Sequence, residues 1–323
     1  MTIAYACDMN YAALTAISAV SALRHNPGAR IALLGLDLAP EARKLVRFRV
    51  EKAGGSFAYH DLSAELNRLK KCGYSGYTSF AAYARIFIPS LIGDERRVIY
   101  LDCDTLVNGP LEALLSFDMQ GKPLALGMDC IVPAYKRYVN APTDRPYCNS
   151  GVLLMDVERW RERKCTERML AELACPHGPN PLGDQDIIVR CLADDIVLLP
   201  PKWNFLSQFF IVSYWGLARI VGAKDGLPFS EDEYLDGRRN AAIYHFSGHT
   251  LGRPWFTSSR HPLRSRYLKA ARAAGLEDAA MQTRPMATDY MAQYLLWRFL
   301  PQPLFDTVCR WMYRLHIRRR YGV

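Results

Sequence analysis

The sequence predicts an α/β domain with a mostly parallel central sheet, helices on both faces and a basic helical C-terminal region. Apolar runs of strand length alternate with amphipathic segments of helix length over the first hundred residues. Half of the 323 residues are hydrophobic and 23% are charged, a composition that is typical of folded globular chains. The net charge is +9, and residues 284–323 hold seven Arg against two Asp.

The first half of the chain is expected to form repeated strand–helix units. Strands are expected at 3–7, 31–36, 56–61 and 97–101, and helices at 12–25, 41–53 and 78–92, the last interrupted near Pro89. Ligands of such sheets bind at the carboxyl ends of the strands. Asp8 and the pair Asp102 and Asp104 follow strands directly, so these carboxylates are candidates for a binding site.

The second half of the chain is more mixed. Strands are expected at 123–129, at 150–156 and in the segment AAIYHF that carries His245. A long charged helix is expected over 157–174, and a further helix opens at Gly183.

The segment VIYL-Asp102-Cys103-Asp104 places two carboxylates just beyond an apolar strand. Carboxylates are hard oxygen ligands that suit Mg²⁺ or Mn²⁺, and such an ion can bind a diphosphate. His245 offers an imidazole, which also suits Mn²⁺. The alternatives are that the two Asp cap a turn and that the His is packed in the core.

Besides a metal site for a diphosphate, the same residues fit two further functions. Asp102-Cys103-Asp104-Thr105 matches the start of haloacid-dehalogenase-type phosphatases, in which the first Asp, here Asp102, is the nucleophile of a Mg²⁺-dependent reaction. That motif usually lies on the first strand of the core, whereas here it follows three strand–helix units. A protein that binds a nucleotide sugar without turnover is the other alternative, although such proteins have usually lost metal ligands that this chain retains.

Five segments in order resemble glycosyltransferase family 8, the retaining enzymes that include bacterial lipopolysaccharide galactosyl- and glucosyltransferases. The segments are YACDMNYAAL, YARIFIPSLI, NSGVLLMD, GDQDI and HFSG…RPW. The resemblance covers about residues 1–256. It implies a GT-A type, Rossmann-like catalytic domain over 1–258, followed by a basic helical region over 259–323. It also implies a UDP-sugar donor and Mn²⁺ (or Mg²⁺).

The resemblance further implies roles for individual residues. Those around the nucleotide and the metal are Ala6, Asp8, Asn10, Tyr11, Asp102, Cys103, Asp104 and His245. Those around the donor sugar and the diphosphate are Arg85, Asp129, Asn149, Asp184, Gln185, Gly248 and Arg253. The nearest candidates for a catalytic role are Asp184, Gln185 and Asp186. A carboxylate at Asp8 can accept the N3–H of uracil, which cytosine lacks.

Retention of the anomeric configuration leaves two mechanisms open. A protein nucleophile forms a covalent glycosyl intermediate, or the acceptor attacks from the side of the leaving group. Gln is a poor nucleophile, so Gln185 favours front-face attack. In that mechanism metal and Arg contacts stabilise the departing diphosphate, and a β-phosphate oxygen takes the acceptor proton.

The C-terminal region carries an apolar stripe at helical spacing, formed by Leu304, Val308, Trp311, Met312 and Leu315. Arg on another face of the same helix predicts binding to an anionic membrane surface. The alternative is a terminal helix that docks on the domain and points its Arg to water. No nucleic-acid-binding motif accompanies the charge, so we expect no nucleic-acid partner.

The remaining features concern location and partners. The nine Cys include no C-x-x-C pair, no signal peptide is visible, and no apolar run reaches the ~20 residues that span a bilayer. We therefore expect a protein of the reducing cytoplasm, peripheral on the inner face of the cytoplasmic membrane. Its expected partners are a UDP-hexose donor (galactose or glucose) and a glycan or lipid-linked saccharide acceptor.

Overall fold

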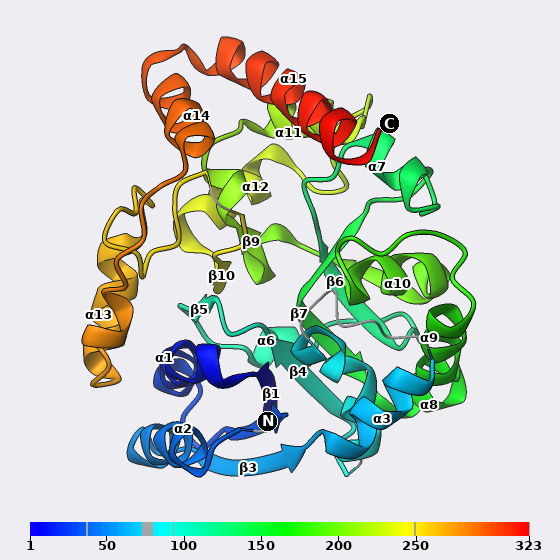
Figure 1. The fold of residues 1–323 in the computed structure, drawn as a ribbon, viewed down its shortest axis with the longest axis vertical. Helices are drawn as coiled ribbons and strands as arrows, with labels where there is room; N and C mark the ends of the chain where they lie inside the picture. Colours follow the sequence, from blue (N-terminus) through cyan, green and yellow to red (C-terminus); the bar gives the residue numbers. More distant parts are fainter. Residues whose placement is uncertain (37, 73–79, 93, 249, 323) are drawn as a thin grey trace.

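The computed structural model of the protein describes residues 1–36, 38–72, 80–92, 94–248 and 250–322 (Figure 1). Its strands are β1 Thr2–Cys7, β2 Arg30–Gly35, β3 Ser56–Asp61, β4 Arg97–Leu101, β5 Thr105–Val107, β6 Leu124–Met128, β7 Cys148–Asp156, β8 Ile196–Leu199, β9 Phe205–Leu206 and β10 Ile243–His245. Its α-helices are α1 Ala12–His25, α2 Pro40–Lys52, α3 Ser63–Lys71, α4 Phe80–Tyr83, α5 Ile88–Leu91, α6 Glu112–Leu115, α7 Pro133–Tyr138, α8 Val157–Glu162, α9 Cys165–Ala174, α10 Asp184–Cys191, α11 Tyr214–Val221, α12 Glu231–Asn240, α13 Arg264–Ala273, α14 Thr288–Phe299 and α15 Gln302–Tyr321.

The central sheet has the strand order β3-β2-β1-β4-β7-β6-β8. All neighbouring strands are parallel except at β7, which runs antiparallel to both β4 and β6. The mostly parallel sheet that the sequence predicts is therefore confirmed, with one reversed strand in its middle. Because β7 is reversed, its first residues lie at the edge of the sheet where β1, β4 and β6 end.

Both faces of this sheet are buried. Along β1, Ile3 and Tyr5 pack into one hydrophobic cluster with α2, whereas Ala4 packs into a second cluster on the opposite face. The same alternation continues in β7, where Leu154 joins the first cluster and Leu153 the second. Side chains of successive strand residues point to opposite faces. Apolar residues on both faces explain why these strands appear as uninterrupted apolar runs in the sequence.

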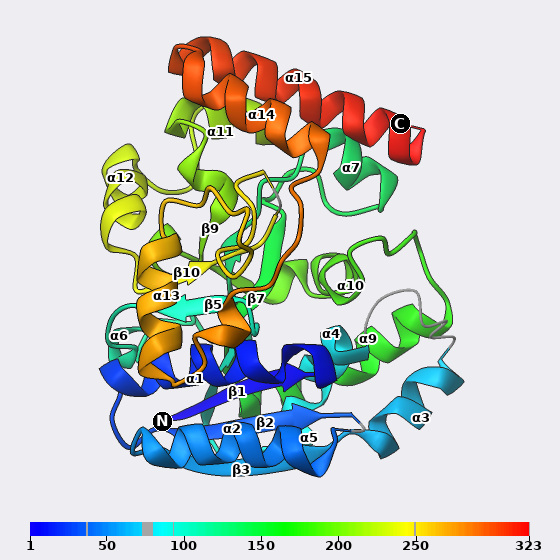
Figure 2. The ribbon, with the colours of Figure 1, turned by 60° about the vertical axis from the view of Figure 1, so that its left-hand side comes forward.

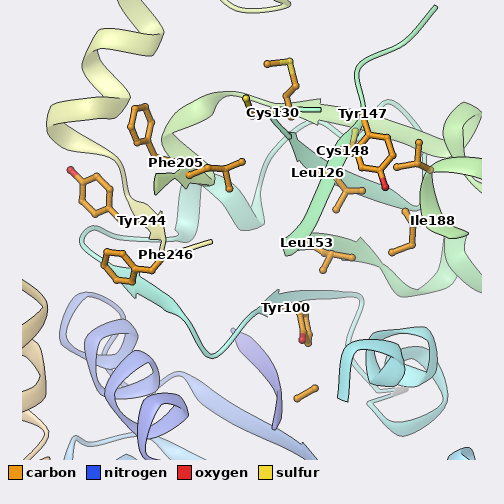
Figure 3. Close-up of a cluster of buried hydrophobic side chains, with 14 of the residues drawn as sticks. Tyr100, Leu126, Cys130, Tyr147, Cys148, Leu153, Ile188, Phe205, Tyr244 and Phe246 are labelled. Atoms are coloured by element: carbon orange, nitrogen blue, oxygen red, sulfur yellow. The ribbon is translucent and has the colours of Figure 1, made fainter. Parts of the chain in front are cut away.

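A second, three-stranded sheet has the order β5-β10-β9. β5 follows the end of β4 almost directly and pairs antiparallel with β10, with His245 opposite Thr105. Aromatic residues fill the core beside it, and Figure 3 shows Phe205, Tyr244 and Phe246 among them. The short sheet thus carries a residue of the distant β10 to the turn that follows β4.

Two expected helices differ in the structure. The segment 157–174 forms α8 and α9 rather than one helix, because Lys164 between them adopts a left-handed conformation with φ 51°. The segment expected as one interrupted helix over 78–92 comprises α4, a 3-10 turn over Ala84–Phe87, and α5. The break therefore lies before Pro89, which sits in the first turn of α5. Residues 78 and 79 lie outside the described residues.

The C-terminal region packs against the rest of the molecule with apolar side chains. α13 lies against α1, and α15 lies against α11 and α7 at the end of the molecule that is far from β3 (Figures 1 and 2). The buried residues of α15 include Phe305, Cys309 and Ile317. In the stripe expected from the sequence, Leu304 and Trp311 are exposed, and Val308, Met312 and Leu315 are half-buried. None of the helices in the described ranges is long and apolar enough to cross a membrane.

Asp306 anchors α15 to α11. Its carboxylate is buried and accepts hydrogen bonds from the Ser213 hydroxyl at 2.5 Å, the Ser213 amide at 3.2 Å and the Gln302 side chain at 2.9 Å. Gly216 leaves space for it, because a Cβ there would lie 2.3 Å from Asp306 Cγ. A helix whose outer face is charged is thus held by one buried acceptor together with its apolar residues.

We expect Asp306→Ala to loosen α15 before the rest of the domain. The substitution leaves the Ser213 hydroxyl and amide without an acceptor, which costs about 1–3 kcal/mol. Hydrogen exchange should accelerate in α14 and α15 while β1 and β4 keep their protection. Asp306→Asn retains an acceptor and should lie between the two forms. Equal acceleration throughout the chain would contradict this local anchoring.

Candidate active site

Polar residues from four strands of the central sheet meet along one edge. Asp8 follows β1, Asp102 follows β4, and Asp129 follows β6. Asn149 lies at the beginning of β7, which is reversed and therefore starts at this same edge. The topology thus brings together residues that are separated by up to 141 positions in the sequence.

The Asp102–Asp104 turn and His245 form a cluster that can hold a metal ion. One ligand atom from each of these three residues lies within 4.8 Å of the others. His245 Nε2 is 3.2 Å from Asp104 Oδ1 and 3.9 Å from Asp102 Oδ2. Backbone bonds hold the arrangement, since the Asp102 amide donates to Gly151 O and the Phe246 amide donates to Asp104 O. Two carboxylates and an imidazole fit a divalent ion such as Mn²⁺.

Two Arg compensate the negative charge of this turn. Arg85 is buried, and its Nη2 lies 3.0 Å from Asp102 Oδ1. Its guanidinium also stacks over the ring of Tyr100, whose hydroxyl donates to the same Asp102 oxygen at 2.8 Å. Arg253 pairs with Asp104 from the other side. The guanidinium of Arg253 therefore lies beside the carboxylates that form the cluster.

These contacts shift the protonation of the cluster. Burial by itself raises the pKa of Asp104, but the charges of His245 and Arg253 outweigh it and hold the pKa well below the usual range. Burial lowers the pKa of His245, but Asp104 and Asp102 outweigh it, so the net shift is upward. Both shifts come from mutual attraction, which favours the ionised carboxylate that a metal ion requires.

The residues expected around a donor sugar form a second, connected group. Asp129 Oδ2 accepts hydrogen bonds from the side chains of Asn149 and Gln185, each at 3.0 Å. Gln185 Oε1 accepts in turn from the Asn149 side chain and the Ser150 amide. Gln185 is brought there by α10, which begins after Gly183 at φ 63°, a left-handed conformation that favours glycine.

Asp184, the first residue of α10, points toward Arg85. Its Oδ2 lies 3.0 Å from Arg85 Nε, but that nitrogen donates its proton to Ala82 O. The buried Oδ2 consequently accepts no hydrogen bond within the described part of the chain. Burial raises the pKa of Asp184 to about 7, although the charge of Arg85 opposes this. A buried acceptor without a donor is an uncommon feature and suits a ligand hydroxyl.

Asp186 lies apart from these groups, although it is next to Gln185 in sequence. The structure gives it a fully buried position in which both oxygens accept from Tyr135 and the Leu182 amide reaches one of them at 2.7 Å. Tyr147 also donates to Oδ1. Asp186 therefore ties α10 to α7, and its oxygens are not directed toward the cluster of Asp102 and Asp104.

The turn after β1 lies beside the same edge. Asp8 caps the 3-10 turn Met9–Tyr11 by accepting from the Asn10 amide at 2.9 Å, and Tyr11 is 40% exposed. Cys103 points away from the metal ligands and donates to Ala6 O at 3.0 Å, so it links this turn to the Asp102–Asp104 turn. Gly248 adopts φ 80° and packs over Gln208, near the beginning of the loop that carries Arg253.

Two residues of the site were not identified from the sequence. Asn204 lies in the core and hydrogen bonds with both His245 and Asn149. Gly151 provides the space that the imidazole occupies, because a Cβ there would lie 2.1 Å from His245 Cε1. The signal for Gly151 was its place in the segment NSGVLLMD. Asn204 lies between Trp203 and the two-residue strand β9, and its local sequence contains no comparable signal.

A mostly parallel sheet of this order, with an acidic pair after β4 and an imidazole supplied by a second small sheet, is the arrangement of a GT-A type glycosyltransferase. The chain belongs to glycosyl transferase family 8, whose sequence profile matches residues 2–258. The resemblance expected from the five sequence segments is confirmed. The comparisons give no support to the phosphatase alternative.

Related proteins agree with this assignment. The chain is 30% identical over 211 residues to the general stress protein A of Bacillus subtilis (strain 168). This alignment covers 64% of this chain and 70% of that protein. It is 30% identical over 131 residues to the lipopolysaccharide 1,2-glucosyltransferase of Escherichia coli (strain K12). This alignment covers 39% of this chain and 38% of that enzyme. Across the first three curated relatives it matches, the chain spans from 70% down to 29% of their length.

The fold has a solved counterpart in the galactosyltransferase LgtC, crystallised in complex with donor and acceptor sugar analogues. The two structures superimpose with a TM-score of 0.67, over 90% of this chain and 99% of that one, at 22% sequence identity. At this level of identity, the likeness shows the fold.

We expect Gly151→Ala to weaken binding of divalent ions. A methyl group at this position overlaps His245 and would also lie 2.8 Å from Asp102 Oδ2, so at least one ligand must move. Overpacking of this kind costs about 1–3 kcal/mol. Calorimetric titration with Mn²⁺ should show a dissociation constant about 5- to 150-fold higher, because each 1.4 kcal/mol is a factor of ten. Gly109→Ala is the matched control, since a Cβ there meets nothing closer than 3.7 Å; equal effects of the two substitutions would exclude a specific effect at Gly151.

Proposed function

We propose that the protein transfers a hexose, galactose or glucose, from a UDP-hexose to a saccharide acceptor, with retention of the anomeric configuration. The acceptor is a glycan or lipid-linked saccharide of lipopolysaccharide or another surface polysaccharide, as the name of the Escherichia coli relative suggests. The observation that carries the proposal is the cluster of Asp102, Asp104 and His245 at the sheet edge, with Arg253 beside it. A bound Mn²⁺ (or Mg²⁺) would neutralise charge on the departing diphosphate.

The turn after β1 is proposed to hold the uridine. The Asp8 carboxylate can accept the uracil N3–H, while Asn10 and Tyr11 line the outer side of the same turn. Ala6 and Cys103 form the floor of this turn through their mutual hydrogen bond. The diphosphate would then extend past the acidic cluster to the loop of Gly248 and Arg253, whose guanidinium can pair with phosphate oxygens.

The connected group of Asp129, Asn149 and Gln185 is proposed to hold the donor hexose. Asp184 supports this proposal because its buried Oδ2 accepts no hydrogen bond from the residues that the structure describes and can accept one from a sugar hydroxyl. Arg85 holds Asp184 and Asp102 in place from behind, at 3.0 Å from each. The hexose would thus lie between the diphosphate and α10.

We infer that the acceptor attacks from the side of the leaving group. Gln185 is a neutral amide, and the oxygens of Asp186 are occupied by Tyr135, Tyr147 and the Leu182 amide. We therefore assign Asp186 to positioning α10 and Gln185 to contact with the hexose. The acceptor proton would pass to the β-phosphate oxygen as the bond to the sugar breaks. A glycosyl adduct trapped on Asp186 would contradict this assignment.

The outer face of the C-terminal helices is proposed to bind an anionic membrane surface from the cytoplasmic side. Leu295 and Phe299 of α14 and Leu304 and Trp311 of α15 are all exposed, as are Arg318–Arg320. Aromatic and apolar side chains beside Arg are typical of helices that lie on anionic bilayers. The other face of the same helix docks on the domain, which leaves the outer face available for the proposed membrane contact.

We expect Asp104→Asn to reduce transfer by more than about 100-fold, since removing even outer-shell partners of a metal ligand costs about 10- to 100-fold. The measurement is release of UDP from UDP-galactose or UDP-glucose in Mn²⁺, with a saccharide acceptor. Asp232→Asn, an exposed residue in the first turn of α12, is the matched control and should retain full activity. Undiminished transfer by the Asp104 variant with Mn²⁺ would refute the site assignment, and phosphate release from simple monoesters would favour the phosphatase.

We expect the triple substitution of Arg318, Arg319 and Arg320 by Gln to release the protein from anionic vesicles without changing its activity. Each basic residue near an anionic surface contributes about 1 kcal/mol, so the partition coefficient should fall by about 100-fold. Binding by the wild type should also weaken in high salt, because charges are screened beyond ~8 Å at physiological ionic strength.

The matched control replaces Arg24, Lys44 and Lys52, three exposed cations on α1 and α2, which lie at the opposite end of the molecule from α15 (Figure 1). Point substitutions are preferred to truncation, because deletion of α15 would expose the core that Phe305 and Ile317 cover. Co-sedimentation with phosphatidylserine vesicles separates the outcomes. Equal release by both triple variants would indicate a general charge effect and exclude a specific face.

A further inference from the structure

The side chain of Asn204 connects the candidate metal site to the candidate sugar site. It lies between the 3-10 turn Pro201–Trp203 and β9, and it is 1% exposed. Its Oδ1 is 3.1 Å from His245 Nδ1, and its Nδ2 is 2.9 Å from Asn149 Oδ1. We propose that Asn204 is a positioning residue that fixes the orientation and tautomer of the His245 imidazole, so that Nε2 is presented to a divalent cation. This inference rests on the proposed metal site.

The direction of each hydrogen bond follows from a backbone amide. The Gly151 N–H can only donate, and it lies 3.0 Å from the Asn149 side chain, so the atom that it meets is Oδ1. The Asn204 atom that faces this same oxygen must therefore be the Nδ2 donor. The other end of the Asn204 carboxamide is then an acceptor, which requires the proton of the imidazole to reside on His245 Nδ1.

The opposite end of Asn149 supports the same assignment. Its Nδ2 donates to the Asp129 carboxylate, which has no proton to give in its ionised form. The orientation of the Asn149 carboxamide is therefore determined at both ends. The orientation of Asn149 therefore fixes the orientation of the Asn204 carboxamide, and Asn204 in turn fixes which imidazole nitrogen of His245 carries the proton.

Two glycines leave the space that this arrangement needs. A Cβ at Gly127 would lie 2.8 Å from Asn204 Cβ, and one at Gly151 would lie 2.7 Å from His245 Nδ1. Gly127 follows an irregularity in the pairing of β6 with β7, where the register shifts after Leu126. The strands thus approach the carboxamide and the imidazole closely from two sides, which leaves the imidazole little rotational freedom.

The proton position on Nδ1 determines what the other imidazole nitrogen, His245 Nε2, can bind. When a cation replaces the proton at Nε2, the proton held at Nδ1 remains, and the Nε2 lone pair would face the cation beside Asp104 and Asp102, whose oxygens lie 3.2 Å and 3.9 Å from Nε2. Outer-shell partners of this kind fix ring orientation and tautomer, and their loss lowers metal affinity by about 10- to 100-fold. Because Asn149 also contacts Asp129 and Gln185, Asn204 additionally links the metal ligand to the group proposed to hold the hexose.

The test is calorimetric titration of the full-length protein with Mn²⁺ alone, so that the readout does not depend on turnover. Asn204→Ala should raise the dissociation constant by about 10- to 100-fold. Asn204→Asp keeps an acceptor for Nδ1–H but loses the donor to Asn149 Oδ1, so its affinity should lie between those of the wild type and Asn204→Ala. Asn26→Ala is the matched control, because Asn26 is also a buried Asn that bridges Ala22 and Leu111, and it should leave Mn²⁺ affinity unchanged.

A double-mutant comparison tests whether Asn204 changes Mn²⁺ affinity through His245. If Asn204 acts through His245, Asn204→Ala should cause no further loss of Mn²⁺ affinity in the His245→Ala background. A two-bond ¹H–¹⁵N spectrum of the Mg²⁺-loaded protein should show His245 with its proton on Nδ1, and a mixture of tautomers in Asn204→Ala. The His245 signal is assigned by its disappearance in His245→Ala.

The outcomes separate this inference from the proposed function. Unchanged Mn²⁺ affinity in Asn204→Ala, an equal loss in Asn26→Ala, or a full additional loss in the His245→Ala background overturns the role of Asn204 and leaves the metal site standing. Absence of Mn²⁺ binding by the wild type, or binding that His245→Ala does not weaken, overturns the metal site and this inference together.

Discussion

Two carboxylates that lie side by side at a sheet edge repel each other, and much of the structure around them offsets this repulsion. Arg85 reaches Asp102 from beneath the sheet edge, and Arg253 reaches Asp104 from a loop 149 residues further along the chain. His245 comes from a third direction, on a strand of the second sheet. The attraction between these groups gives the site its protonation state, with Asp104 ionised and ready to accept a cation.

The same edge depends on one reversed strand. If β7 ran parallel to its neighbours, Asn149 and Gly151 would lie at the opposite edge, where Asp156 now lies near Arg97. Its reversal brings a backbone carbonyl to the Asp102 amide and a glycine to the imidazole of His245. The absence of a side chain at Gly151 is therefore as necessary to the cluster as the ligands themselves, because a methyl group would occupy the position of the ring.

The C-terminal helices show how one element combines two surfaces. α15 covers part of the core with Phe305, Cys309 and Ile317 and is anchored by the buried Asp306. Its other face keeps Trp311 and the terminal Arg in solvent. A helix that docks through one face can present the other as a rigid unit, so attachment to a surface need not disturb the sheet edge that carries the chemistry.

The sequence by itself determined the strands β1 to β4 and the helices α1 and α2, because apolar periodicity depends on near neighbours in the chain, whereas α3 was not predicted. It also determined the Asp102–Asp104 turn, whose two carboxylates and preceding strand are contiguous, and the family, through five ordered segments. It predicted one helix over 157–174 and missed the break at Lys164, since the left-handed conformation of that residue has no local signature. Only the tertiary structure decided the direction of β7, the buried face of α15, the separation of Asp186 from Gln185, and the place of Asn204 between His245 and Asn149. These features depend mainly on contacts between residues 20 or more positions apart, or on which of two apolar faces finds a partner, and neither is encoded in local spacing.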